Sequence, residues 1–342
     1  MSTTEKTAKK KAGPVKSDAF VGYLRAHKKF PNLWCPGCGN GIVMSSLIRA
    51  IEKLELSKDD VAMVSGIGCS SRMPVYLDFQ ALHTTHGRAL AFATGVKFAR
   101  PDLKVIVITG DGDALSIGGN HLIHACRRNI DITTILINNY TYGMTGGQAS
   151  PTTPSGAYAT TTPFGNTEKQ FDPCALAKGA GATFVARTTV YHTPQMDKIL
   201  MEGISHRGFS FIEVISNCHT YYGRLNHLGQ ATALLRRFQE KASKQAQNDA
   251  VCSEESKDLI VTGVLHRDTE KTELCDEYQK LLDSLAKGGG HELDVAAPGT
   301  SAFRPVRDPA LGFRRPGHDA RGDAAERSHR RGPAAQRDPD QV

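Results

Sequence analysis

The sequence contains no long apolar run. No segment approaches the roughly 20 residues that a helix needs to cross a bilayer, and the first twenty residues lack the apolar stretch of a signal peptide. We therefore expect a cytoplasmic protein without membrane contact. Disulfides are rare in a reducing cytoplasm, so the eight cysteines raise the question of metal ligands rather than of cross-links.

Features of a nucleic-acid-binding protein are also scarce, although the formal net charge is +7. Lysines crowd the first thirty residues and arginines crowd the last thirty or so, and such runs are typical of solvated tails. Basic and aromatic residues do not interleave as they do in nucleic-acid-binding modules. We predict a basic disordered arm over residues 1–30 and a disordered tail rich in arginine, proline and alanine over 288–342. A frameshift in a GC-rich gene would produce a similar tail.

Between these ends, buried strands alternate with helices. Nearly continuous β-branched runs predict strands, for example over residues 104–109 and 132–137. The pattern predicts a parallel α/β sheet with helices on both faces, joined by right-handed crossovers. We assign residues 31–230 to this domain and residues 231–287 to a helical C-terminal extension. The loop over residues 141–170 is long enough to suggest a functional role.

Two of the predicted strands end in polar residues suited to bind a diphosphate and Mg²⁺. The first is followed by Gly110, Asp111 and Gly112, and the second ends in Asn138 and Asn139. Ligands of open α/β sheets lie beyond the carboxyl ends of the strands, and carboxylate and amide oxygens are the ligands that Mg²⁺ prefers. A lone GDG is common in ordinary turns. The spacing of Asp111 and Asn139 and their strand context match the thiamine diphosphate motif.

Four cysteines lie in loops that a single sheet could bring together. Cys35 and Cys38 form a CxxC pair, Cys69 follows the strand over residues 61–65, and Cys218 follows the strand over residues 210–216. Four thiolates suit Zn²⁺ and an iron–sulfur cluster equally well. Cys174 is the alternative fourth ligand, but it lies in an amphipathic helix and is more typical of a packing residue.

Several longer segments resemble the β subunit of 2-oxoacid:ferredoxin oxidoreductases, with the 2-oxoglutarate type most similar. They read WCPGCGNG, GIGCSSRMP, HTTHGRALAFATGVK, TGDGDALSIGGNHLIHACRRNID and NNYTYGMTGGQASPTT. The resemblance runs from about Trp34 to Tyr222, and more thinly to about Lys287. The arginine-rich tail departs from the family.

The resemblance implies particular roles for residues of this chain. Mg²⁺ would be held by Asp111, Asn139 and the backbone carbonyl of Thr141. Arg72 would lie close to the substrate, and the region of His83 and His86 near the active site, so that Arg72 and His86 are the candidate catalytic residues. The diphosphate would be lined by Gly110, Asp111, Gly112, Asp113, Asn139, Thr141, Tyr142, Gly143, Met144 and Thr145.

The resemblance also implies an activity and its cofactors. The enzyme would oxidatively decarboxylate a 2-oxoacid, with 2-oxoglutarate as the expected substrate, to acyl-CoA and CO₂. Thiamine diphosphate would carry the carbon chemistry. A [4Fe–4S] cluster, favoured over zinc because this chemistry needs an electron acceptor, would be held by Cys35, Cys38, Cys69 and Cys218. Electrons would pass to ferredoxin, coenzyme A would take the acyl group, and a separate α subunit would complete an (αβ)₂ assembly.

Other functions remain open at this point. Pyruvate or a branched-chain 2-oxoacid could replace 2-oxoglutarate. A non-oxidative thiamine diphosphate lyase or carboligase would share Asp111 and Asn139, but it would have no need of the four cysteines. A zinc-stabilised assembly subunit would share the cysteines, but it would have no need of the Asp111 and Asn139 pair.

Overall fold

A computed structural model describes residues 17–27, 32–244 and 259–286. The predicted C-terminal tail and most of the predicted N-terminal arm lie outside these ranges. Helices long and apolar enough to cross a membrane are absent from the described residues.

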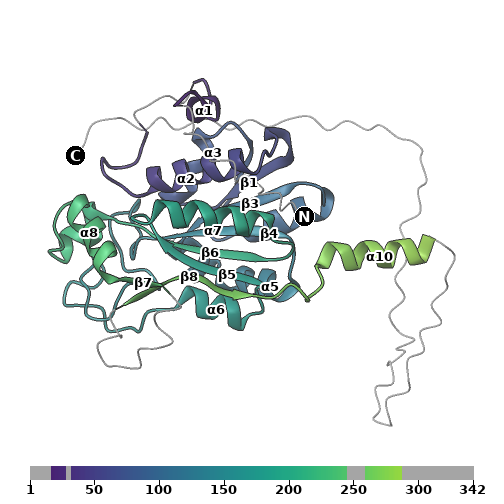
Figure 1. The fold of residues 1–342 in the computed structure, drawn as a ribbon. Coiled ribbons are helices and arrows are strands. Elements are labelled where there is room, and N and C mark those ends of the chain that lie inside the picture. The colour runs from purple at the N-terminus through teal and green to yellow at the C-terminus, as the bar shows by residue number, and fades with distance from the viewer. Residues whose placement is uncertain (1–16, 28–31, 245–258, 287–342) are drawn as a thin grey trace, which may run out of the picture. The chain divides into compact units, whose positions relative to one another are not determined.

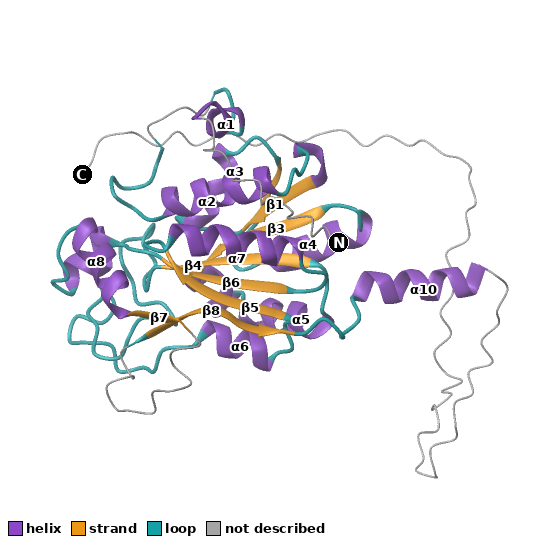
Figure 2. Ribbon diagram, in the orientation of Figure 1, coloured by secondary structure: helices purple, strands orange, loops and turns teal. Residues whose placement is uncertain are grey.

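An eight-stranded sheet organises the described residues, in the order β2-β1-β3-β4-β6-β5-β8-β7 (orange in Figure 2). Adjacent strands from β2 through β5 run parallel. The expected parallel α/β sheet is therefore confirmed for this part of the fold. The strands are β1 (Val61–Ser65), β2 (Gln80–His83), β3 (Lys104–Gly110), β4 (Ile132–Asn138), β5 (Phe184–Thr189), β6 (Ser210–Ile215), β7 (Ala242–Lys244) and β8 (Ile260–Arg267).

Helices cover both faces of the sheet, as expected for strands that are apolar on both sides. One core cluster joins α2 and α7 to one face, and a second joins α4, α5 and α6 to the other; Figure 1 shows α2 and α7 on one side and α5 and α6 on the other. The helices are α1 (Ser17–Gly22), α2 (Asn40–Lys53), α3 (Met73–Tyr76), α4 (Ala89–Ala99), α5 (Gly119–Arg128), α6 (Pro173–Gly179), α7 (Thr193–Ser205), α8 (Ala231–Lys241) and α10 (Leu274–Ala286). Short 3₁₀ turns occupy Lys58–Asp60 and Ser70–Arg72, and π-helical turns occupy Asp113–Ile117 and His219–Gly223.

The predicted helical extension over residues 231–287 is wrong in its middle part. The first helix of this extension, α8, ends at Lys241, and β7 follows it directly. β8 then pairs antiparallel with β5. The apolar signal of β8 in the sequence is weak because the strand is partly exposed. Its place in the sheet is evident only from its pairing with β5.

The predicted disordered arm over residues 1–30 also needs correction at its C-terminal end. Residues 17–22 form α1, and Phe20, Tyr23 and Leu24 pack against the main core. The Arg25 guanidinium donates to the carbonyls of Leu77 and Phe79 at 2.8 and 2.9 Å. Apolar contacts and charge-assisted hydrogen bonds thus order this stretch.

A buried ion-pair network connects the C-terminal helix to the sheet. The Lys97 ammonium, 1% exposed, lies 2.8 Å from an oxygen of Asp131. Arg207 contacts the same Asp131 oxygen at 2.8 Å and also pairs with Glu273, next to the start of α10. A buried lysine requires such a partner because an uncompensated buried charge is costly.

Candidate active site

The loops after β1, β3, β4 and β6 meet at one edge of the sheet. These strands are parallel, so their carboxyl ends lie together. Two adjoining cavities occupy this edge. We name one after the predicted cofactor and the other after the cysteines that line it. The cofactor cavity is lined by Ile67, Gly68, Cys69, Ser70, His86, Gly110, Asp111, Gly112, Asp113, Asn139, Thr141, Tyr142, Gly143, Met144 and Thr145. The cysteine cavity is lined by Leu33, Trp34, Cys35, Cys38, Cys69, Arg72, Asn139, Gly143, Met144, Asn217, Cys218, His219, Thr220 and Tyr221.

Asp111 is the buried acid of the cofactor cavity. It follows β3, is 2% exposed, and accepts hydrogen bonds from the hydroxyls of Ser150 and Thr152 at 2.5 and 2.8 Å. Burial raises the pKa of Asp111 to about 6, against the lowering effect of these hydroxyls. A buried carboxylate with hydroxyl partners and no cationic side chain bonded to it is a fitting ligand for Mg²⁺.

The chain turns tightly after Asp111. A π-helical turn spans Asp113–Ile117, and α5 begins at Gly119. Gly112 lies against Tyr142, and a Cβ added at Gly112 would be 2.2 Å from the Tyr142 ring. Glycine is therefore required there for the two loops to approach.

His86 and Asp113 form a hydrogen-bonded pair on the wall of the cofactor cavity. His86 Nδ1 lies 2.6 Å from Asp113 Oδ1. The buried Asp113 also accepts from the backbone N–H of Gly87 at 2.7 Å and from the Thr109 hydroxyl at 2.7 Å. Both Asp113 oxygens are thus occupied by protein donors. Asp113 lines the predicted diphosphate site, but its bonds orient the His86 ring.

The cysteine cavity collects the four cysteines of the predicted cluster site. A Cβ placed on Gly143 would lie 3.4 Å from Cys69 Sγ and 3.8 Å from Cys218 Sγ. Burial, followed by repulsion between the thiolates, raises the pKa of Cys38 to about 12 and that of Cys69 to about 11. Thiols that resist ionisation when buried together need a bound cation to become thiolates.

Hydrogen bonds hold the three cysteine-bearing loops against one another. The Trp34 indole N–H donates to the Cys69 carbonyl at 2.7 Å, and the Asn217 amide donates to the Gly37 carbonyl at 2.9 Å. Gly37 also packs on the first turn of α8, where a Cβ at Gly37 would be 2.8 Å from that of Ala231. The CxxC loop is therefore fixed from two sides.

Several buried polar atoms around these loops have no partner in the described residues. They are Asn40 Nδ2, Arg72 Nε, Ser216 Oγ, Asn217 Oδ1 and His219 Nδ1. Buried polar groups almost always find hydrogen-bond partners. Asn40 Nδ2, Arg72 Nε and Ser216 Oγ are donors, and unpaired donors beside four thiols fit a bound group with sulfur acceptors.

The structure places Arg72, His83 and Cys174 outside the cofactor cavity. Arg72 lines the cysteine cavity rather than the cofactor cavity. His83, at the end of β2, contacts the Ser65 hydroxyl at 2.9 Å and lines neither cavity. Cys174 is buried in α6, where its thiol lies 3.3 Å from Glu213, and it is not among the residues of the cysteine cavity.

The sequence interpretation missed the residues that support Asp111 from behind. Ser150 and Thr152 lie in the long loop after β4, and Asn138 had no role beyond its place in the Asn138–Asn139 pair. Their contribution depends on how that loop folds back over β3 and β4. Only the serine and threonine content of the loop hinted at it.

Comparisons with known proteins agree with this geometry. The family model of the C-terminal TPP-binding domain of thiamine pyrophosphate enzymes matches residues 66–214. The chain is 51% identical to 2-oxoglutarate synthase subunit KorB of Methanocaldococcus jannaschii over 263 residues, which are 77% of this chain and 97% of that protein. It is 46% identical to 2-oxoacid:ferredoxin oxidoreductase subunit beta of Saccharolobus solfataricus, over 56% of this chain and 63% of that protein.

A solved structure is also similar. It is 2-oxoglutarate:ferredoxin oxidoreductase from Magnetococcus marinus with 2-oxoglutarate, coenzyme A and succinyl-CoA bound. The match has a TM-score of 0.70 and 31% sequence identity, and it covers 82% of this chain and 94% of that chain.

The fold and the cofactor cavity are those of a thiamine diphosphate-binding domain. This confirms the expected cofactor class. The chain belongs to the family of 2-oxoacid:ferredoxin oxidoreductase β subunits, which also contains the KorB proteins. It is accordingly one subunit of an oxidoreductase that acts with a further subunit.

Proposed function

We propose that the chain is the β subunit of a 2-oxoglutarate:ferredoxin oxidoreductase, which converts 2-oxoglutarate and coenzyme A to succinyl-CoA and CO₂ and passes the two electrons released to two molecules of oxidised ferredoxin. The observation that carries the proposal is the wall shared by the two cavities. Cys69, Asn139, Gly143 and Met144 line both of them. A thiamine site and a redox centre separated by one layer of residues suit oxidative decarboxylation, whereas a non-oxidative lyase needs no such neighbour.

The cysteine spacing favours a [4Fe–4S] cluster over zinc. Tetrahedral zinc, with Zn–S bonds of about 2.3 Å, holds its sulfurs about 3.8 Å apart. Within residues 17–27, 32–244 and 259–286, one group of three or more possible ligand atoms lies within 4.8 Å, and it is Asp172, Cys174 and Glu213. No three of the four thiols of the cysteine cavity lie within 4.8 Å of one another, so they are not arranged for tetrahedral zinc.

Mg²⁺ would be held by Asp111, Asn139 and the Thr141 carbonyl, with the diphosphate between them. Asp111 supplies the charge, and Asn139 and Thr141 line the same cavity. Bound thiamine diphosphate supplies the electron sink for loss of CO₂. The chain's own part is to orient the diphosphate and to bury the reacting end.

His86 is proposed to hold or move a proton at the cavity wall. Asp113 fixes one ring nitrogen, Nδ1, so Nε2 is left for the ligand side. His86 is 37% exposed at its side chain, whereas Asp113 is 2% exposed. The pair therefore joins a buried anchor to a side chain that reaches the cavity. Arg72, beside the cysteines, remains a candidate for contact with substrate.

The active site needs the partner subunit. Ile67, Ile117 and Met144 are large apolar residues in or next to the cofactor-cavity loops, and they are 39%, 52% and 49% exposed. Exposed apolar residues around a ligand cavity mark an interaction surface. We propose that an α subunit covers this rim, supplies the pyrimidine side of the site, and joins this chain in an (αβ)₂ assembly in the cytoplasm.

Electrons would leave on the side of the CxxC loop and α8. Cys35 is exposed there. Arg224 and Arg237, both exposed, flank the Cys218 loop: Arg224 lies over the ring of Tyr221 at 6.0 Å, and Arg237 lines a cavity with Cys218 and Tyr222. Complementary charge speeds and orients association. We propose Arg224 and Arg237 as the docking patch for an acidic ferredoxin.

Charge reversal tests this patch. In the full complex, R224E/R237E should raise KM for ferredoxin about tenfold at low salt, with the difference shrinking as salt rises. Turnover with an uncharged artificial acceptor should be unchanged. The matched control is R100E/R128E, because α4 and α5 end at the opposite edge of the sheet. An unchanged KM for ferredoxin in R224E/R237E would reject the patch.

The function itself is tested with anaerobically purified complex. It should be brown, contain iron and acid-labile sulfide, and lose absorbance near about 400 nm when 2-oxoglutarate and coenzyme A are added. Pyruvate and branched-chain 2-oxoacids should give kcat/KM values at least about tenfold lower. A colourless, zinc-containing protein would disprove the redox function, and equal kcat/KM for pyruvate would disprove the substrate assignment.

A further inference from the structure

One charged residue lies inside the otherwise apolar strand β6. Glu213 is 1% exposed. Its Oε2 accepts from Arg187 Nε at 2.6 Å, and its Oε1 accepts from Asn138 Nδ2 at 2.8 Å. A buried ion pair seldom adds net stability to a protein. A charged residue at this buried position therefore points to a specific task.

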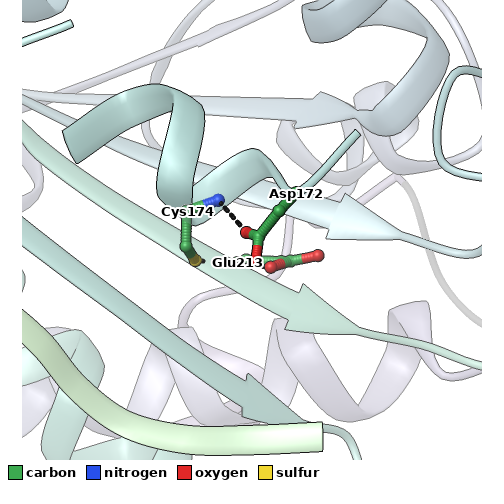
Figure 3. A group of neighbouring side chains, drawn as sticks. All are labelled: Asp172, Cys174 and Glu213. Atoms are coloured by element: carbon green, nitrogen blue, oxygen red, sulfur yellow. Dashed lines mark hydrogen bonds between the residues drawn. The ribbon is translucent and has the colours of Figure 1, made fainter. Parts of the chain in front are cut away.

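The group of Asp172, Cys174 and Glu213 resembles a metal site at first sight (Figure 3). Arg187 already serves as its cation, since it pairs with Glu213 at 2.6 Å and with Asp172 at 2.5 Å. Asp172 also caps α6 by accepting from the backbone N–H groups of Cys174 and Ala175. Arg187, held in turn by Asp172, therefore anchors Glu213, and the group is not a ligand set.

The other side of Glu213 leads to the cofactor cavity. Asn138 Nδ2 donates to Glu213 Oε1, so Asn138 Oδ1 faces the opposite way. That oxygen accepts from the backbone N–H of Tyr140 at 3.1 Å and lies 2.9 Å from the Thr152 hydroxyl. Thr152 is in turn 2.8 Å from Asp111 Oδ2, so its one hydroxyl hydrogen is shared between these two acceptor oxygens.

Asn138 thus joins both halves of the proposed magnesium site. Through Thr152 it reaches Asp111 at the end of β3. Through the Tyr140 N–H it holds the loop that carries Asn139 and Thr141. Tyr140 has φ of 63°, a left-handed conformation that is unfavourable for a bulky residue and needs such support.

We infer that Glu213 is a positioning residue for the magnesium site, because it fixes the orientation of the Asn138 amide that aligns Asp111 with the Asn139–Thr141 loop. This inference rests on the proposed Mg²⁺–diphosphate site. Glutamine at 213 would place an N–H₂ group against either Arg187 Nε–H or Asn138 Nδ2. The second clash is relieved only if Asn138 flips and withdraws its oxygen from the Tyr140 N–H.

Magnesium affinity of the full complex tests the inference. With thiamine diphosphate at saturation, E213Q should weaken Mg²⁺ binding, measured calorimetrically, or Mn²⁺ binding, measured by EPR, by about tenfold or more. Iron content should be unchanged. The control is C174A, which removes a thiol 3.3 Å from Glu213 Oε2 without touching Asn138. It should bind Mg²⁺ as the wild type does.

A swapped pair distinguishes positioning from general damage. In N138D/E213Q the amide at 213 donates to a carboxylate at 138, which still accepts from Tyr140, and the number of buried charges is the same. This variant should recover most of the lost Mg²⁺ affinity. If E213Q does not assemble, T152V breaks the same connection and should show the same loss.

The possible outcomes distinguish failure of the magnesium site from failure of the positioning role of Glu213. A wild-type complex whose thiamine diphosphate binding ignores divalent cations would overturn the magnesium site itself. The other outcome is a wild type that depends on magnesium and an E213Q variant, or T152V in its place, that binds Mg²⁺ as tightly as C174A does. That outcome would overturn only the positioning role.

Discussion

Replacing Cys218 with alanine is expected to abolish electron transfer to ferredoxin, with a fall of at least about a thousandfold in turnover. Cys218 is one of four cysteines in one cavity, and a cluster that loses a thiolate is lost or becomes unstable. Thiamine diphosphate binding should survive, because Cys218 does not line the cofactor cavity. Iron analysis, EPR of the reduced complex and thiamine diphosphate titration measure the three quantities.

Cys174→Ala is the matched control for this experiment. Cys174 was the competing fourth ligand. It is likewise a free cysteine, but it is buried, whereas Cys218 is partly exposed. It lies in α6 against Glu213 and Ala186. Its replacement should leave iron content and ferredoxin reduction unchanged. Loss of the cluster in C174A, with retention in C218A, would reverse the assignment of the fourth ligand.

The second large effect is expected on stability, from D131N. This change leaves the Lys97 ammonium, 1% exposed, without its carboxylate. Breaking a buried pair on one side costs about 3–5 kcal/mol, which for a chain of this size lowers Tm by roughly 10 °C. It should also loosen α10, because Arg207 connects Asp131 to Glu273. Thermal unfolding and hydrogen exchange of the α10 amides measure both effects.

Lys97→Met provides the asymmetric control. Asp131 would keep its contact with Arg207 at 2.8 Å, so no buried charge is left alone. An apolar replacement of similar length is often neutral, within about 1 kcal/mol. Equal destabilisation by K97M and D131N would mean that lost packing, and not an uncompensated charge, determines the stability.

Local signals, extended by the family resemblance, predicted which residues line the cofactor cavity. Gly110 to Asp113 and Asn139 to Thr145 come from two neighbouring parallel strands, and parallel strands bring their carboxyl ends together whatever else the fold does. Each of these motifs carries its own turn chemistry. Their meeting in one cavity therefore required only the correct assignment of two strands.

Other features depend on partners that are distant in the sequence. β8 takes its place from antiparallel pairing with β5, and α1 is ordered by contacts with the core. The role of Glu213 arises from the alignment of Arg187 opposite Glu213 on β5 and β6 and from a bond to Asn138. Arg72 was expected close to the substrate, but the 3₁₀ turn at Ser70–Arg72 directs it into the cysteine cavity.

The single cysteine cavity of the described chain also determines how many ferredoxin encounters each catalytic cycle needs. Oxidative decarboxylation releases two electrons, whereas one [4Fe–4S] centre passes them singly. One such centre, held in the cysteine cavity beside Gly143 as proposed, would pass on the first electron before it took the second. Under the proposed function, two separate ferredoxin encounters are needed for every CO₂ released, so the concentration of oxidised carrier governs how long the half-oxidised enzyme waits.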